Sequence, residues 1–254
     1  MTERTNTNPD YGNWVSNRLI YGSVILGIIF LGLSFLFKIL IILAVFFFVC
    51  FVYFLYARRQ FSPRKGNLQN RVRDLVPGYL EWDGHGEALD IGCGNGPLVV
   101  ALAKKYPQSR VTGIDYWGSD WDYSQAGCEE NARLEGVSDR TSFQKASAST
   151  LPFDDGRFDA VVSNFVFHEV HDTKDKRALI KEALRVLKKG GAFSFQDLFL
   201  VKAYYGETED LLETIRNWGL ERVDFVKTNE LDFIPPALKL PFMLGQIAVI
   251  HGRK

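Results

Sequence analysis

The chain has 254 residues, 46% of them hydrophobic, and its 30 basic and 30 acidic side chains cancel to a formal net charge of zero. A chain of this length buries one good-sized core, and balanced charge gives no field that favours nucleic acid, so no nucleic-acid partner is expected. The three cysteines lie far apart and form no C-x-x-C pair. This argues against a disulfide framework or a zinc site and fits a reducing, intracellular setting.

The first predicted element is a long apolar segment. Between residues 19 and 56 the only charged residue is Lys38. One helix of that length would measure roughly 57 Å, about twice the thickness of a bilayer core. The sequence favours two spans, 19–37 and 39–56, with Lys38 at the turn. A single tilted span remains an alternative because turn-forming residues near Lys38 are few. A pair of buried core helices is a further alternative.

Basic residues flank this segment, with Arg18 before it and Arg58 and Arg59 after it. The positive-inside tendency places both flanks in the cytoplasm. We therefore expect membrane localisation, with the large domain on the cytoplasmic side. The expected organisation in chain order is a cytosolic tail at 1–18, a transmembrane segment of two helices at 19–57, a connector with a short helix over 66–76 at 58–80, and an α/β domain at 81–254.

The rest of the chain alternates predicted strands with predicted helices. The strands are expected at 87–92, 110–115, 140–147, 158–165, 192–199, 220–227 and 245–252, and the helices at 97–106, 123–136, 175–191 and 208–219. Repeated β-α units of this length predict an α/β fold, a mostly parallel sheet with helices on both faces. Such sheets bind ligands beyond the carboxyl ends of their strands, where the strand order reverses.

Three glycines follow the first strand of this domain, in the stretch "DIGCGNGP". Gly92, Gly94 and Gly96 can adopt positive φ, and they leave room for a ligand beside the backbone N–H groups of a helix start. A dinucleotide fingerprint counted from Gly92 would need glycine where Pro97 stands. Asp115 ends the second strand, where a carboxylate can accept hydrogen bonds from both hydroxyls of a ribose.

The D-x-G-x-G-x-G loop resembles the first motif of class I S-adenosylmethionine-dependent methyltransferases. Two later stretches, "LPFDDGRFDAVVSNFVFHEV" and "ALIKEALRVLKKGG", look like the fourth and fifth motifs of the type 11 group, which includes the ubiquinone and menaquinone biosynthesis enzymes. The resemblance covers residues 86–200 and implies a Rossmann-like sheet of seven strands whose last strand is antiparallel. It also implies S-adenosyl-L-methionine as the cofactor. Residues 1–60 have no counterpart in that family.

The resemblance implies a set of cofactor contacts. In this reading Asp90 supports the glycine loop or reaches the cofactor ammonium through water, Tyr116 or Trp117 stacks on adenine, and Cys93 fills space rather than acting as a nucleophile. Strand-end capping is the alternative for Asp90, and helix-to-sheet packing is the alternative for the two aromatic residues. The implied cofactor-binding residues are Asp90, Gly92, Cys93, Gly94, Gly96, Asp115, Tyr116, Ser147, Ala148 and Asn164.

One position departs from the family pattern. Where the family has an aspartate that accepts a hydrogen bond from the adenine amino group, this chain has Ser147. A hydroxyl makes a weaker contact than a carboxylate. The alternative is that Ser147 is an ordinary loop residue and that the backbone of Ala148 recognises the ring.

Two residues near strand ends are candidate catalytic groups. His168 follows the fourth strand and Asp197 lies at the end of the fifth, and either can act as a base toward a methyl acceptor. A purely structural histidine stays open. No metal is expected, because His168 and His171 lack the H-E-x-x-H spacing that puts two imidazoles on one zinc ion.

The sequence therefore predicts a membrane-anchored enzyme that transfers a methyl group from S-adenosyl-L-methionine to a small acceptor. The apolar segment favours a lipophilic, membrane-soluble acceptor. Two other functions stay open, a catalytically silent membrane scaffold that binds the cofactor and an NAD(P)-dependent oxidoreductase. The methylated atom and the oligomeric state have no signature in the sequence.

Overall fold

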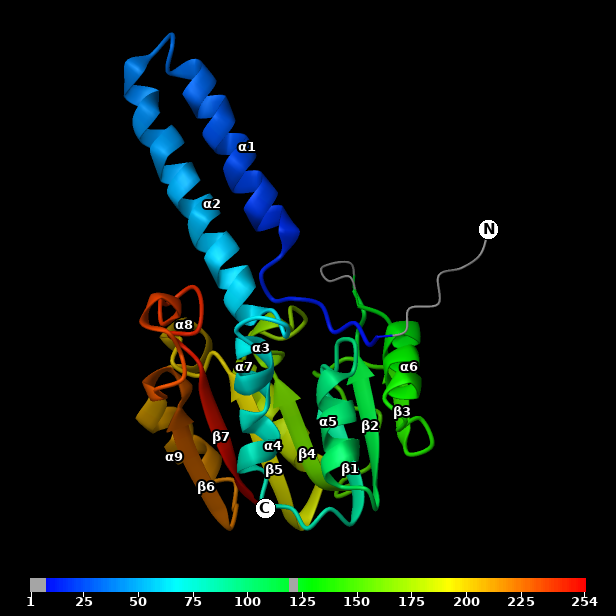
Figure 1. Ribbon diagram of the computed structural model, residues 1–254. Coiled ribbons are helices and arrows are strands. Elements are labelled where there is room, and N and C mark those ends of the chain that lie inside the picture. Colours follow the sequence, from blue (N-terminus) through cyan, green and yellow to red (C-terminus); the bar gives the residue numbers. More distant parts are fainter. Residues whose placement is uncertain (1–7, 119–122) are drawn as a thin grey trace. The chain divides into compact units, whose positions relative to one another are not determined.

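The computed structural model describes residues 8–118 and 123–254 (Figure 1). The chain separates into two compact units. One contains Gly12–Val72, and the other combines Arg73–Lys254 with the segment that ends at Tyr11.

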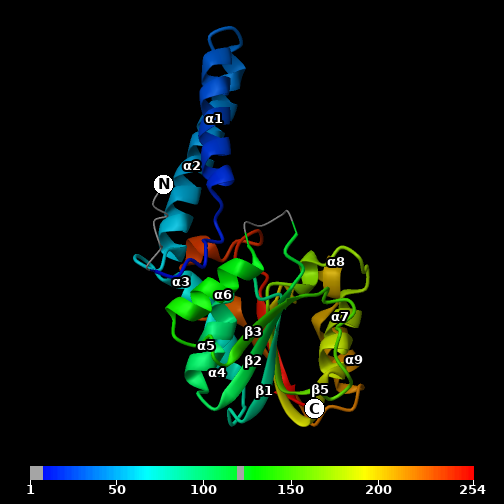
Figure 2. The same ribbon diagram turned by 90° about the vertical axis from the view of Figure 1, so that its right-hand side faces the viewer.

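The first unit contains a helical hairpin. Helix α1 (Asn17–Leu33) and helix α2 (Ile41–Phe61) run side by side in opposite directions and are joined through the short helix η1 (Lys38–Leu40) (Figures 1 and 2). The rings of Phe30 and Phe47 stack with their centroids 5.5 Å apart. The expected pair of helices is therefore present, with Lys38 at their connection.

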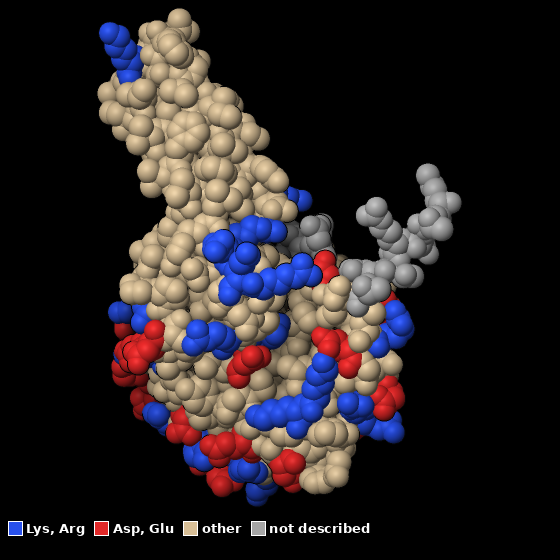
Figure 3. Space-filling model, in the orientation of Figure 1, with Lys and Arg blue, Asp and Glu red and all other residues tan. Residues whose placement is uncertain are grey.

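The surface of the hairpin is strongly apolar. The stretch Lys38–Phe61 is long and apolar enough to cross a membrane, with a mean hydropathy of 3.0, whereas α1 is shorter. Eight large apolar side chains of α2 are exposed, among them Phe46 and Val49. Figure 3 shows a visible face that is almost free of charged side chains between the two ends of the hairpin.

The second unit is built on a seven-stranded sheet in the order β3-β2-β1-β4-β5-β7-β6. The strands are β1 (Gly86–Ile91), β2 (Ser109–Asp115), β3 (Thr141–Lys145), β4 (Phe158–Asn164), β5 (Leu187–Asp197), β6 (Arg222–Lys227) and β7 (Ala248–Arg253). Strands β1 to β5 pair in parallel, and β7 runs antiparallel to both of its neighbours. The predicted Rossmann-like methyltransferase sheet with an antiparallel last strand is confirmed.

Helices cover both faces of this sheet, with α4, α5 and α6 on one face and α7 and α9 on the other (Figure 2). The remaining elements are α3 (Leu68–Arg73), α4 (Leu75–Tyr79), α5 (Pro97–Lys105), α6 (Gln125–Leu134), η2 (Phe167–Glu169), α7 (Lys176–Arg185), α8 (Lys202–Tyr205), α9 (Thr208–Arg216), η3 (Thr228–Glu230) and η4 (Pro236–Leu238). Each face has its own core of buried apolar side chains. Double coverage explains why the central strands read as continuous apolar runs.

Two expected elements differ in extent. The helix expected over 175–191 ends at Arg185, and Leu187–Gly191 instead begin β5. Leu187 is fully buried and pairs with Phe158, and burial of this apolar stretch in the sheet outweighs its helix-like pattern. The connector helix expected over 66–76 is divided into α3 and α4.

The strand order locates the ligand-binding edge. From β1 the chain proceeds outward to β2 and β3, and then returns to the other side of β1 as β4. The order therefore reverses between β1 and β4. Ligands of open α/β sheets bind in the crevice beyond the carboxyl ends of the strands at this position.

Candidate functional site

The glycine loop after β1 needs glycine for two reasons. Gly92, Gly94 and Gly96 have φ values of 75°, 57° and 79°, which side chains disfavour. A Cβ on Gly92 would also lie only 2.0 Å from a methyl group of Val166. Gly96 is the N-cap of α5 and offers no side-chain cap, so the backbone N–H groups of the first turn are left for other partners.

Asp115 ties this loop to the end of β2. Its carboxylate accepts hydrogen bonds from the backbone N–H of Gly94 and of Trp117, both at 2.8 Å. The indole N–H of Trp117 donates to the carbonyl of Gly94 at 2.9 Å. A carboxylate has about four lone-pair positions, so Asp115 keeps acceptor capacity for a ligand hydroxyl.

Backbone strain marks the same edge of the sheet. Trp117 and Phe165 are aromatic residues with φ values of 44° and 59°, and they follow β2 and β4 almost directly. Aromatic side chains rarely adopt this conformation, which costs of order 1–3 kcal/mol and is concentrated at binding and catalytic sites.

Asp90 is a buried carboxylate at the end of β1. Only 1% of the residue is exposed, and neither carboxylate oxygen has a hydrogen-bond partner among the residues that the structure describes. Burial, and after it the charge of Asp115, raise the pKa of Asp90 to about 8 against the opposing charge of Arg73. The amide oxygen of Asn164, at the end of the adjacent strand β4, also lacks a partner within the described residues. Buried polar groups without partners are costly, so this edge suits a ligand with a cationic or donor group.

The loop after β3 contacts a carboxylate, that of Asp172, which the sequence did not indicate. Asp172 Oδ2 accepts hydrogen bonds from the hydroxyls of Ser147 and Ser149, at 2.9 and 2.7 Å. Ala148, between the two serines, is buried. Asp172 stands 25 positions after Ser147, beyond β4, so only the fold brings a negative charge to the position where this chain has serine in place of the family's aspartate.

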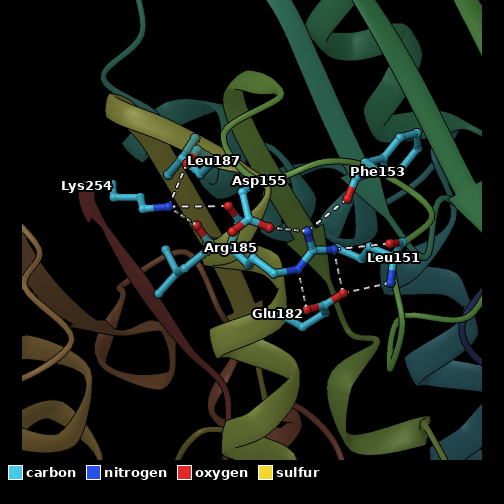
Figure 4. Close-up of polar contacts among 8 residues, drawn as sticks. Leu151, Phe153, Asp155, Glu182, Arg185, Leu187 and Lys254 are labelled. Carbon is cyan, nitrogen blue, oxygen red and sulfur yellow. Dashed lines mark hydrogen bonds and ion pairs between the residues drawn. The ribbon is translucent and has the colours of Figure 1, made fainter.

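Arg185 holds the continuation of this loop (Figure 4). Its guanidinium donates to the carbonyls of Leu151 and Phe153 and forms ion pairs with Asp155 and Glu182. Glu182 in turn accepts from the backbone N–H of Leu151 at 2.8 Å. The loop that begins at Ser147 is therefore fixed to α7.

Tyr116 and Cys93 occupy opposite environments. The ring of Tyr116 is 66% exposed, and the Lys145 ammonium lies 5.1 Å from its centroid, so the ring is available at the rim. Cys93 is buried beside Cys128, and burial together with this neighbour raises the pKa of the Cys93 thiol. A buried thiol with a raised pKa packs as a small apolar group and is a poor nucleophile.

His168 and Asp197 form a hydrogen-bonded pair. The imidazole Nδ1 lies 2.7 Å from Asp197 Oδ1, and the other carboxylate oxygen accepts from the backbone N–H of Val166 and Phe167. Asp197 has no exposed surface, whereas 16% of the His168 side chain is exposed. Asp197 therefore orients the imidazole, and of the two side chains only that of His168 reaches the surface.

The Asp197 carboxylate raises the pKa of His168. Burial lowers the pKa of His168, but the hydrogen bond and the charge of Asp197 outweigh burial and raise the pKa above the ordinary value of 6.5. With Nδ1 occupied by Asp197, Nε2 is the nitrogen left for proton transfer.

The predicted site residues lie in three groups at the carboxyl edge of the sheet. Asp90, the glycine loop, Asp115 and Asn164 surround the point where the strand order reverses. Ser147 and Ala148 lie in the loop after β3. Val166 joins the glycine loop to the pair of His168 and Asp197. Its side chain packs against Gly92, and its backbone N–H donates a hydrogen bond to the Asp197 carboxylate.

Comparison with known proteins finds relatives of the part of the chain that contains this edge of the sheet. Residues 89–195 match the family described as "Methyltransferase domain". A 27-O-demethylrifamycin SV methyltransferase from Amycolatopsis mediterranei is 32% identical over 160 residues, which are 63% of this chain and 56% of the relative. A demethylmenaquinone methyltransferase from Staphylococcus aureus is 37% identical over 106 residues, 41% of this chain and 40% of the relative. The chain thus spans about half the length of these relatives.

Solved structures share the fold. The [4+2]-cyclase SpnF superposes with a TM-score of 0.55 at 23% identity, covering 72% of this chain and 80% of that one. Geranyl diphosphate C-methyltransferase from Streptomyces coelicolor A3(2) gives 0.56 at 16% identity, covering 74% and 80%. One of these proteins is a cyclase and the other a methyltransferase, so the fold alone does not decide the reaction.

Replacing Asp90 with asparagine tests the buried carboxyl. The unfolded chain ionises this group near pH 4, whereas the folded chain keeps its proton until about pH 8, so stability from this group falls as the pH rises between these values. Asp90→Asn should therefore stabilise the protein, by a margin that grows from pH 5 to pH 8 by at most about 1.4 kcal/mol per pH unit. Urea unfolding at several pH values measures this margin.

The exposed Asp154→Asn serves as the control and should show no such growth. A pH-independent difference between Asp90→Asn and the parent chain would mean that Asp90 ionises normally in the folded protein.

Proposed function

We propose that this chain, in which residues 89–195 form a methyltransferase domain, transfers a methyl group from S-adenosyl-L-methionine to a small acceptor. The observation that carries this proposal is the unpartnered, buried carboxylate of Asp90 beside a positive-φ glycine loop. That carboxylate suits the ammonium of the cofactor, and Asp115 keeps acceptor capacity for its ribose hydroxyls. The cofactor supplies an activated methyl group on a sulfonium.

The chain's own contribution is then alignment, exclusion of water and removal of a proton. His168 Nε2 would take the proton of an acceptor hydroxyl or acidic carbon, with Asp197 stabilising the imidazolium that forms. The named substrates of both relatives, a demethylrifamycin and a demethylmenaquinone, are small molecules. Their names support the same class of acceptor here.

Asp172 would complete the adenine end of the cofactor site. Ser147 carries no charge, but its hydroxyl is hydrogen-bonded to the Asp172 carboxylate, which is polarised further by Ser149. The resulting cluster offers a charged acceptor for an amino group beside the buried backbone of Ala148. Hydrogen bonds to an ionised acceptor are stronger than those between neutral groups.

The apolar hairpin supports a membrane location, with the methyltransferase domain on the cytoplasmic side. One helix is long and apolar enough to cross a bilayer, and the exposed side chains of the hairpin would otherwise face water. Arg18, Arg58 and Arg59 at its base would face the cytoplasm by the positive-inside tendency. An enzyme held there meets acceptors dissolved in the lipid, so a lipophilic acceptor is the preferred class.

Moving the carboxylate from position 172 to position 147 tests its role at the adenine end of the site. Asp172→Asn should weaken binding of S-adenosylhomocysteine about tenfold, the value of one charge-assisted hydrogen bond. The double variant S147D/D172N places the carboxylate at the position usual in the family and should restore affinity. Isothermal titration calorimetry measures each affinity, with Asp154→Asn as the control. Equal affinity of Asp172→Asn and the parent chain would remove Asp172 from the site.

Methyl transfer by the full chain tests the reaction and its base. With methyl-labelled S-adenosylmethionine and a membrane extract, the parent chain should label a lipid-soluble product, at a rate that rises with pH through a pKa above 6.5, because only neutral His168 accepts a proton. His168→Gln should lower kcat by about 10²- to 10⁴-fold. The exposed His171→Gln is the matched control.

The alternatives give different results in that assay. Binding of S-adenosylhomocysteine without any labelled product would favour a silent scaffold. A thermal shift with NAD and none with S-adenosylhomocysteine would favour an oxidoreductase.

Membrane insertion is testable on α2. The full chain should stay in the membrane fraction after an alkaline wash that strips peripheral proteins. Val45→Lys with Val49→Lys changes two exposed positions of α2 and adds about 3 kcal/mol of insertion cost per lysine, so this variant should appear in the supernatant. Val45→Leu with Val49→Leu is the control. Release of the parent chain by the wash would contradict a membrane anchor.

A further inference from the structure

Residues 8–11 precede the hairpin in the sequence but belong to the unit that contains the sheet (Figure 1). The backbone N–H of Asp10 donates to the Asn131 side-chain oxygen, and the Asn131 amide nitrogen donates back to the carbonyl of Asp10, both at 2.9 Å. Asn131 lies on α6 and is 4% exposed. A buried amide thus pairs with the backbone of Asp10 in the way that a neighbouring strand would.

The same amide reaches the glycine loop. Asn131 Nδ2 also donates to the carbonyl of Asn95 at 3.0 Å, and Asn95 Nδ2 donates to the carbonyl of Asp10 at 3.3 Å. Asn95 stands between Gly94 and Gly96. The three residues Asp10, Asn95 and Asn131 therefore form a closed set of hydrogen bonds, and one of its members lies inside the loop.

Tyr11 fastens the end of this segment. Its hydroxyl donates to Glu135 just after α6, at 3.1 Å, and the Arg73 guanidinium lies 5.8 Å from the centroid of its ring. The charge of Arg73 also acts on Asp90, the unpartnered carboxylate of the site. Tyr11 thus lies between α6 and a cation that influences the site.

We propose that residues 8–11 act as a positioning strap that holds the glycine loop in its cofactor-binding conformation. Glycines have the largest conformational freedom of all residues, and a loop with three of them must lose that freedom when it binds a ligand. A loop already held through Asn95 loses less on binding, so its affinity for the ligand is higher. The strap rests on the proposed cofactor, and it makes cofactor affinity depend on residues that precede the hairpin.

Two substitutions in the full chain test the strap. Asn131→Asp removes both amide donations and places a carboxylate against the carbonyls of Asp10 and Asn95. Asp10→Pro leaves α6 intact and removes the N–H whose hydrogen bond Asn131 accepts, and it also replaces the side chain and fixes φ at this position. Each should raise the Kd for S-adenosylhomocysteine at least tenfold and raise KM for S-adenosylmethionine, while kcat at saturating cofactor stays within twofold. Hydrogen exchange of the backbone amides of residues 92–96 should become faster.

Matched variants separate positioning from general loss of structure. Glu130→Gln, an exposed change on the same helix, should bind as the parent chain does, and Asp10→Ala, which keeps the N–H, should be milder than Asp10→Pro. Parent-like Kd and loop exchange in both Asn131→Asp and Asp10→Pro would overturn the strap. If the parent chain binds no S-adenosylhomocysteine, the proposed function fails, and loop exchange in the two variants still decides whether the strap holds the loop.

Discussion

The hydrogen bond from the Gly94 N–H to the Asp115 carboxylate is the contact on which the binding edge depends. It joins the loop after β1 to the end of β2, and Trp117 closes the same junction with its backbone and indole N–H groups. The glycines give the loop freedom to curl around a ligand, and Asp115 restricts that freedom to one conformation. A site made chiefly of backbone needs such a restraint, because the three glycines have no side chains that could fix the shape of the loop.

Burial of unpaired polar groups gives this edge its chemical character. Asp90 and Asn164 lie at the ends of neighbouring strands with oxygens that no described residue satisfies. A folded chain tolerates that cost where a ligand repays it by hydrogen bonding or by charge. The strained backbone at Trp117 and Phe165 marks the same edge, so two independent features coincide there.

The segment after β4 connects the binding site to the proposed chemistry. Val166 packs against the glycine loop and donates a backbone hydrogen bond to Asp197. His168 is hydrogen-bonded to Asp197, and Asp172 accepts a hydrogen bond from Ser147 in the loop after β3. One short stretch of chain thus serves the cofactor loop, the base and the adenine end. A shift of this segment would disturb all three together. The Asp197 carboxylate holds the segment in place by accepting hydrogen bonds from two of its backbone N–H groups.

The sequence by itself determined the α/β fold, the seven strands, the glycine loop and the paired apolar helices. These features are local: hydrophobic periodicity, glycine spacing and segment length are readable without a partner. It also named His168 and Asp197, but as separate candidates. Only the tertiary structure showed that one is buried and orients the other, because burial depends on how β4 and β5 lie side by side.

The tertiary structure also decided where β5 begins and which groups complete the site. The pattern at 175–191 predicts a continuous helix, yet sheet burial draws Leu187 and its neighbours into β5. Asp172 and the segment at Asp10 gave no signal, since each reaches its partners across many residues of chain. Such pairings form only when distant segments are folded against each other, so neither spacing nor composition contains them.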